Sequence, residues 1–512
     1  MLGAMAWGAT GIGATALLGA CSGGGGEATS ASSASGVARR GGTARVVTLG
    51  SAADTTFNPF SVSGLTDYTA GFALRDNLVL IVGDKTEYGL ASSIEPDATA
   101  KNWTIKLRSG VTWHDGSPLT SEDVAWTLTQ FADPKVSPSY SQFFAVIDAK
   151  NIKQIDALTL QVPLHVARGD FVDGVLSQYS PVLKAQTTDF TKALGTGPFK
   201  LESYQGGRNA RLIRNENYWG GEVYLDAIEV TSVSDATARL NAVKGDQADY
   251  ACGISPTGAR TLGTGGAVEA RPGGAAASSA MCFAFNVSQK PFDDPRVVQA
   301  VKLAVDRKAL VDTVLAGYGQ IGADVIGMGM PGYDSSLTPP ARDVARAKEL
   351  FAQAGVSSFT MRAADFAPGI VAATELLAEQ LATVGVQVSV EKAPADSYFA
   401  DFAKVISTPA QGFYFVNRPP VIHMSSYTGS QGAFNVTGFK PADYDKALIA
   451  AQALVDDTAR TAAINALQKQ LHDEDGLVVW GYQENLDAVR STLKGVTLSQ
   501  TVPQFASAYY TA

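Results

Sequence analysis

The sequence predicts an α/β fold in which helices pack against mainly parallel sheets. The strand signal is clearest at 102–107, where apolar and polar residues alternate strictly. The helix signal is clearest at 295–315, where apolar residues recur at helical spacing after an Asp-Pro cap. Helices and a strand alternate again between 343 and 390, as they do in βα units. With 512 residues, the chain is long enough for two or more domains.

Composition narrows the class of protein. The chain is 46% hydrophobic and 17% charged, which is typical of a globular protein. Its formal net charge is −9 and no basic patch is evident, so we expect no nucleic acid as a partner. The four histidines lie far apart in the sequence and form no local metal-ligand motif. We therefore expect no metal ion and no cofactor.

The first 42 residues differ in composition from the rest of the chain. Residues 1–21 form an uncharged apolar stretch that we interpret as a signal peptide. Its last four residues (LGAC) resemble the lipobox of bacterial lipoproteins, which implies lipidation of Cys21 and anchoring to the membrane. Residues 22–42 are rich in Gly, Ser and Ala and predict a disordered tether. The alternative for 1–20 is a buried helix, and the lack of an early Lys or Arg indicates that the true start could lie upstream of Met1.

The elements from residue 43 to residue 131 can be placed in order. A strand is expected at 43–49, a break at 57–60, and a helix followed by a strand within 67–82. The strand at 102–107 leads through a turn into a second short strand. Thr120 then stands at a helix N-cap position, with carboxylates in the first turn of the helix that follows.

The rest of the chain continues the mixture of strands and helices. Further strands are expected at 152–155, 157–163, 211–217, 225–230, 281–285, 386–390 and 477–482. Further helices are expected at 235–243, 343–354 and 371–384, with two more within 443–473. The run 317–322 fits GxGxxG, but it follows a helix, whereas a dinucleotide site needs a strand before the glycines.

Two cysteines fall within the predicted domains. Cys252 follows one expected strand and Cys282 lies in another. If these strands are neighbours, a disulfide could form in an oxidising compartment. The alternative is a pair of buried free thiols.

Several motifs carry a resemblance to a known family. The segment 102–124 fits aromatic-x-hydrophobic-x-LR-x-GV-x-aromatic-HDG-x-PLT-x-EDV. A GTGPF turn follows at 195–199, then N-x-x-Y-W at 215–219 and N-x-x-x-x-PF at 286–292. Together these motifs resemble the family 5 solute-binding proteins of ABC importers, the peptide and nickel binders. The resemblance extends from about residue 43 to the C-terminus.

The resemblance implies a bilobal periplasmic-binding-protein-like fold, of the class with an extra domain, and a hinge between the lobes. Domain I would be discontinuous and built from residues 43–75, 195–285 and 493–512. Domain II would span residues 76–194 and extend the first lobe. Domain III would form the second lobe from residues 286–492.

The resemblance also implies a function. The protein would be a monomeric receptor outside the cytoplasm that captures a peptide or peptide-like solute by hinge closure and delivers it to an ABC permease. We expect no enzymatic activity, because the chain lacks GxSxG, HExxH and GxxxxGK motifs. Two alternatives stay open: a secreted hydrolase of oligomers, and a surface interaction or signalling protein that kept the fold.

Candidate ligand-binding residues come from loops that line the cleft in this family. The peptide binders carry W-x-x-D-x-x-D-P in a segment whose first Asp holds the ammonium of the peptide, whereas residues 415–420 here read FVNRPP. The loss of that acid favours an anionic or uncharged solute, because a buried ammonium needs a partner. The candidates are Phe57, Asn58, Ser63, Arg362, Asp365, Phe366, Phe415, Asn417, Arg418 and His423.

Three of these assignments have a plainer alternative. Phe57 and Asn58 could belong to a turn with core aromatics. Arg418 could hold a carboxylate or phosphate through its planar fork, or could be an exposed loop charge. His423 invites comparison with the nickel binders, although a single histidine is more often structural.

Overall fold

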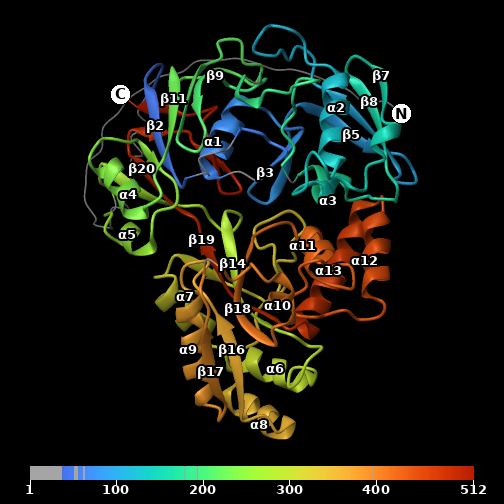
Figure 1. Cartoon of the computed structure of the whole chain (residues 1–512), viewed down its shortest axis with the longest axis vertical. Coiled ribbons are helices and arrows are strands. Elements are labelled where there is room, and N and C mark those ends of the chain that lie inside the picture. Colours follow the sequence, from blue (N-terminus) through green and yellow to red (C-terminus); the bar gives the residue numbers. More distant parts are fainter. Residues whose placement is uncertain are drawn as a thin grey trace, which may run out of the picture. The chain divides into compact units, whose positions relative to one another are not determined.

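The computed structural model describes residues 37–50, 56–61, 64–177, 179–192, 194–263, 265–395 and 397–511. The expected signal peptide, Cys21, most of the expected tether and Ser63 lie outside the described residues. Residues Ala38–Ala512 form one compact unit. Its helices pack on mixed sheets, which confirms the α/β class, and these sheets divide the unit into two lobes (Figure 1).

The first lobe is centred on a seven-stranded sheet. The order is β13-β20-β12-β2-β11-β10-β9, and the central β2 runs parallel to both of its neighbours. The strands are β2 (Thr43–Thr48), β9 (Phe199–Gln205), β10 (Asn209–Arg214), β11 (Ala227–Ser232), β12 (Tyr250–Ala251), β13 (Val268–Pro272) and β20 (Leu486–Arg490). The helices that belong to this part are α1 (Leu65–Leu74), α4 (Ala236–Lys244) and α5 (Pro256–Arg260).

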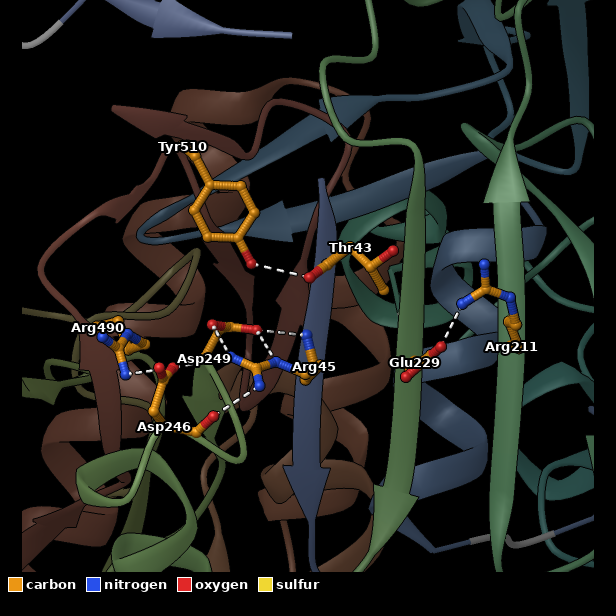
Figure 2. A network of polar contacts seen from close by, with 8 residues as sticks. All are labelled: Thr43, Arg45, Arg211, Glu229, Asp246, Asp249, Arg490 and Tyr510. Atoms are coloured by element: carbon orange, nitrogen blue, oxygen red, sulfur yellow. Dashed lines mark hydrogen bonds and ion pairs between the residues drawn. The ribbon is translucent and has the colours of Figure 1, made fainter. Parts of the chain in front are cut away.

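Polar contacts at one end of this sheet tie distant parts of the chain together (Figure 2). Arg45 on β2 donates to both carboxylate oxygens of Asp249, each at 2.9 Å. Asp246 accepts from Arg45 at 3.1 Å and from Arg490 at 2.7 Å. The hydroxyl of Tyr510 donates to the carbonyl of Thr43 at 3.0 Å. The beginning, the middle and the end of the chain therefore meet in the first lobe.

A smaller antiparallel sheet extends the first lobe. Its order is β5-β6-β8-β7, and it comprises β5 (Ala91–Pro96), β6 (Asn102–Leu107), β7 (Lys153–Asp156) and β8 (Thr159–Pro163). The hairpin β3 (Val79–Val82) and β4 (Lys85–Tyr88) and the helices α2 (Ser121–Ala132) and α3 (Ser141–Phe144) accompany it. The predicted cap of α2 is confirmed, since the backbone N–H of Thr120 donates to Asp123 at 2.9 Å.

The second lobe is built around a six-stranded sheet. The order is β15-β19-β14-β18-β16-β17, with parallel pairing along β18-β16-β17 and antiparallel pairing elsewhere. The strands are β14 (Ser278–Phe285), β15 (Gly319–Ile321), β16 (Ser358–Ala363), β17 (Gln387–Lys392), β18 (Ala410–Val416) and β19 (Leu477–Glu484). Both large sheets are thus more mixed than the mainly parallel arrangement that we expected.

Helices cover the second lobe. They are α6 (Pro295–Ala304), α7 (Arg307–Val314), α8 (Val344–Ala354), α9 (Ile370–Ala382), α10 (Phe402–Ser407), α11 (Pro420–Tyr427), α12 (Tyr444–Ala453) and α13 (Asp457–Glu474). The single helix expected at 295–315 is in fact two, because the side chain of Asp306 caps a new helix by accepting from the N–H of Ala309 at 2.9 Å.

Two crossovers connect the lobes, from β13 to β14 and from β19 to β20. The N–H of Gly273 donates to the carbonyl of Asn485, and the N–H of Asn485 donates to that of Ala277, both at 2.8 Å. The two crossing segments are therefore bonded side by side, which suits a hinge.

The pairing of strands shifts three expected boundaries. β14 pairs with β18 and β19 in the second lobe, although we expected residues up to 285 in domain I. β20 pairs with β12 and β13 in the first lobe, although we expected residues up to 492 in domain III. β1 (Ala38–Arg39) lies within the expected tether, yet it pairs with β24 (Tyr509–Thr511). Long-range pairing decides these boundaries, and local periodicity does not report it.

The two described cysteines are free and buried, so the disulfide alternative is wrong. Cys252 follows β12 in the first lobe, whereas Cys282 lies on β14 in the second. They belong to separate hydrophobic clusters, so their strands are not neighbours.

Candidate functional site

The signature motifs of the sequence bond to one another within the first lobe. The imidazole of His114 accepts from the N–H of Gly195 through Nδ1 at 3.2 Å and contacts the carbonyl of Gly197 through Nε2 at 3.0 Å. This pattern requires a neutral ring that donates through Nε2. Burial lowers the pKa of His114 to about 4, which keeps the ring neutral near pH 7.

The remaining motifs converge on a half-buried carboxylate, that of Asp76. Asp76 accepts from the hydroxyl of Thr196 at 2.9 Å, from that of Tyr218 at 3.1 Å and from the indole of Trp219 at 2.7 Å. A Cβ on Gly195 would lie 1.7 Å from the carbonyl oxygen of Leu74, so this position has room only for glycine. The HDG, GTGPF and N-x-x-Y-W motifs therefore hold one another in place.

Phe57 and Asn58 fit the plainer reading, in which they shape a turn. Phe57 is buried between the guanidinium of Arg75, 4.5 Å from its ring centroid, and the ring of Tyr204, stacked at 4.7 Å. Its φ of 59° lies in the left-handed region, which a phenylalanine adopts only under constraint. The side chain of Asn58 accepts from the N–H of Phe60 at 2.9 Å.

Beside this turn lie two charged residues that sequence reasoning missed. Arg75 and Asp67 are 1% and 4% exposed, and both line a small cavity of about 10 Å³. Nε of Arg75 and Oδ2 of Asp67 form no hydrogen bond with the described residues. Burial lowers the pKa of Arg75. The available signal was a pair of charges in the otherwise uncharged segment 65–75. The cavity has room for about one water.

Tyrosines continue the wall of the first lobe towards the second. The rings of Tyr68 and Tyr140 pack on Tyr179, with centroids 5.2 and 6.0 Å away, and the Tyr68 and Tyr140 hydroxyls are hydrogen-bonded to each other. Burial raises the pKa of Tyr140, whereas the charge of Arg418 lowers it. Arg418 of the second lobe therefore lies near this wall, and its guanidinium is 5.4 Å from the ring centroid of Phe143.

In the second lobe, Phe415 and His423 belong to an aromatic cluster. The ring of His423 stacks on Tyr427 at 5.1 Å and meets Phe415 edge-on at 5.2 Å. Burial, aided by the charge of Arg418, lowers the pKa of His423 to about 3. Within the described ranges no three His, Cys, Asp or Glu side chains are placed to hold a metal ion. The geometry fits the structural alternative for His423.

Asn417 connects the candidate segment to the hinge. Its side-chain amide donates to the carbonyls of Ala275 at 2.9 Å and Met328 at 2.8 Å. Ala275 lies on the crossover that leads into β14. Since Arg418 is the next residue, its backbone position is coupled to the crossover.

The other three candidates lie in a neighbouring cluster. Arg362 lies over the ring of Tyr398 at 4.2 Å, and Phe366 packs on the same ring at 4.5 Å. Asp365 accepts from the N–H of Val371 at 3.1 Å and so caps α9. Arg362 lines a different cavity of about 350 Å³, whose walls include no residue of the Phe143–Arg418 contact.

A cavity of about 190 Å³ lies between the lobes beside the Phe143–Arg418 contact, and we call it the junction cavity. Its lining residues from the first lobe are Gln142, Phe143, Arg168 and Gly174. Those from the second lobe are Ile422, Ser425, Ser426, Gln431 and Ala433. Arg168 is ion-paired with Asp170 at 2.6 Å, so the polar groups that remain are amides and hydroxyls. Sequence reasoning missed these residues, because tertiary contacts bring them together.

The chain resembles known proteins over most of its length. Residues 85–431 match the family described as bacterial extracellular solute-binding proteins, family 5 Middle. The chain is 24% identical to the dipeptide-binding protein of Escherichia coli over 481 residues, covering 86% of this chain and 89% of that protein. It is 24% identical to heme-binding protein A of Haemophilus influenzae over 431 residues, covering 76% and 77%.

Solved structures show the same fold. The substrate-binding protein CtaP of Listeria monocytogenes matches with a TM-score of 0.79 and 19% identity, covering 93% of this chain and 100% of that one. The periplasmic binding protein DppA of Helicobacter pylori, in complex with the peptide STSA, matches with a TM-score of 0.72 and 20% identity, covering 93% and 99%. In the described part of this chain, no helix is both long enough and apolar enough to cross a membrane.

Proposed function

The chain belongs to the bacterial extracellular solute-binding proteins of family 5, and on this premise we propose that it captures a peptide-like solute between its lobes for an ABC permease. The observation that carries the proposal is the pair of hydrogen-bonded crossovers beside a polar junction cavity. A solute that contacts both lobes would favour the closed arrangement by its difference in affinity for the two states. No bond in the solute changes in this mechanism.

The chemistry of the solute follows from the groups at the junction. Arg418 reaches the wall of the first lobe, and the junction cavity presents amides and hydroxyls. The segment 415–419 carries no carboxylate. Leaving an ammonium buried without a partner costs several kcal/mol. We therefore propose a peptide or peptide-like solute whose end near Arg418 is anionic or uncharged.

Names of relatives support the peptide class without deciding the solute. The dipeptide-binding protein of Escherichia coli and the oligopeptide-binding protein OppA of Bacillus subtilis are peptide binders by name, whereas one similar protein is named for heme. Arg418 contacts the solute in this proposal. Its neighbours Phe415, Asn417 and His423 hold the segment that carries it, whereas Phe57, Asn58, Arg362, Asp365 and Phe366 are proposed contacts only for a solute that extends beyond the junction cavity. Ser63 remains a candidate contact by its place in the loop.

We further propose a lipidated receptor held outside the cytoplasm. Cys21 would carry the lipid, the residues that follow it would form the tether, and the protein would act as a monomer. Mass spectrometry of protein extracted from membranes tests this part of the proposal. A mass without lipid on Cys21 would contradict it, and the binding role would stand.

The binding role has its own experiment. Protein purified without added solute is denatured, and the released small molecules are identified by mass spectrometry. The same molecule is then added back to fresh protein, and we expect it to raise the melting temperature and to be recovered chemically unchanged. Recovery of a cleaved product would favour the hydrolase alternative.

A further inference from the structure

A second cavity between the lobes has a composition unlike that of the junction cavity. We call it the outer groove, and its volume is about 560 Å³. The first lobe contributes Thr86, Tyr88, Ile94, Pro96, Trp103, Gly169, Val172 and Asp173, and the second lobe contributes Val455, Asp457 and Arg460. None of these residues is a candidate for binding the transported solute. A volume of this size is typical of small-molecule sites.

The exposed lining of the outer groove is mainly polar, and aromatic and aliphatic side chains contribute the rest. Tyr88 is 40% exposed and Trp103 is 4% exposed, so the phenol is accessible and the indole forms part of the floor. Ile94 and Val455 add aliphatic surface from opposite lobes. Aromatic rings beside an aliphatic wall suit a cation on an apolar stem.

Carboxylates outnumber available cations in this groove. Oδ1 of Asp173 accepts from the hydroxyl of Thr86 at 2.6 Å, and Oδ2 receives no hydrogen bond from the described residues. Burial raises the pKa of Asp173, with Arg460 opposing the shift and the nearby Asp170 and Asp457 adding to it. Asp173 is therefore a half-buried acid whose charge is incompletely compensated.

Arg460 does not neutralise Asp173 by direct contact. Its guanidinium donates to the carbonyls of Leu454 at 2.9 Å and Val455 at 3.2 Å, and it is ion-paired with Asp457. Its two terminal nitrogens are thus engaged by groups of the second lobe. Burial raises the pKa of Tyr88, and the negative charges of Asp173, Glu95 and Asp457 add to this shift.

We propose that the outer groove binds an organic cation, a primary ammonium or guanidinium on an aliphatic stem, with its charge at Asp173 and its stem against Tyr88 and Trp103. The cation could be a free amine or a Lys or Arg side chain on the surface of another protein. Since both lobes line the groove, an occupant bridges them and couples to their relative position. This site is separate from the one that we assign to the transported solute.

The test uses n-butylguanidinium as the free cation and the blocked peptide acetyl-Gly-Lys-Gly-amide as the protein-borne form. Calorimetric titration at low salt should give saturable binding of n-butylguanidinium to the full chain. Asp173→Asn keeps the shape of the side chain and should weaken binding about tenfold. Asp312→Asn, an exposed position on α7, changes the net charge equally and should leave binding unchanged.

The outcomes separate the sources and can overturn the proposal. Binding of both probes indicates a protein-borne side chain, whereas binding of the free cation alone indicates a small amine. If Asp173→Asn fails to fold, Tyr88→Ala at the exposed rim provides the second test and should also weaken binding. Equal affinity in wild type and in these variants, or no saturable binding at millimolar concentrations, would overturn the assignment.

Discussion

Arg418 and Phe143 form a cation–π contact that joins the two lobes, with 5.4 Å between the guanidinium carbon and the ring centroid. Such contacts contribute about 0.5–2 kcal/mol, depending on how far they are desolvated. The pair lies next to the junction cavity, which Phe143 also lines. A solute that binds in the junction cavity must therefore contact Phe143 or displace its ring from Arg418.

The first prediction concerns Arg418. We expect Arg418→Ala to weaken the binding of an acetylated tripeptide with a free carboxylate by about tenfold, because the planar guanidinium is lost as a carboxylate partner. The C-amidated tripeptide should lose much less affinity. Calorimetric titration measures both, and Lys440→Ala, at an exposed position in the same lobe, controls for the lost charge. Equal losses for the two peptides would show that Arg418 does not read the carboxylate.

The second prediction concerns the contact between the lobes at Gly169. The N–H of Gly169 donates to the carbonyl of Gln452 at 2.6 Å, and a Cβ at Gly169 would lie 1.8 Å from the carbonyl oxygen of Leu454. Gly169→Ala should therefore force the loop between α12 and α13 away from the first lobe. We expect a larger radius of gyration by X-ray scattering and faster proteolysis of this loop.

A matched control is available for that experiment. Gly263 has no heavy atom within 4 Å of its ideal Cβ, so Gly263→Ala should leave the scattering profile unchanged. An unchanged profile for Gly169→Ala as well would mean that the loop can move aside without moving the lobe.

The third prediction is a pH dependence set by His114. Its pKa is about 4 in the folded protein and about 6.5 in an unfolded chain, so the unfolded state binds the extra proton first. The free energy of unfolding should fall as the pH drops from about 6.5 to about 4, by about 3 kcal/mol from this residue alone. Urea denaturation at a series of pH values measures the slope. His114→Gln should have a flatter slope in that window, and identical slopes would contradict the assignment.

The fourth prediction concerns the buried thiols. Burial raises the pKa values of Cys252 and Cys282, so both should resist a thiol reagent at pH 8 in the native protein. After denaturation without a reductant, both should react, because neither is bonded. Peptide mapping of the labelled sites provides the measurement. Labelling that appears only after reduction would reveal a disulfide.

Local structure was more predictable than its assembly. The cap formed by Thr120 and Asp123 was predicted because it depends on residues three apart. The break at Asp306 was missed because the apolar spacing continues across it while the capping carboxylate starts a new helix. Capping chemistry outweighed periodicity there.

The site was less predictable than the fold. Asn58 turned out to stabilise its own turn, which a local Asx pattern could have suggested. Arg75 and Asp67 were missed because the cavity that they line also needs residues 57–61, and these meet only in the folded protein. The junction cavity draws on residues nearly 300 positions apart, and no periodic pattern reports such a meeting.

The first lobe, parts of which Figure 2 shows side by side, is completed by strands from the C-terminal end of the chain. Strands β20 and β24 follow the whole second lobe in sequence, yet they pair with β12 and with β1 in the first lobe. A chain emerging in order from its N-terminus must therefore carry an incomplete seven-stranded sheet, with the edge of β12 uncovered, until β20 follows. An unpaired strand edge invites association with other chains. Completion of the first lobe therefore depends on residues 486–490, which follow the whole second lobe in the sequence.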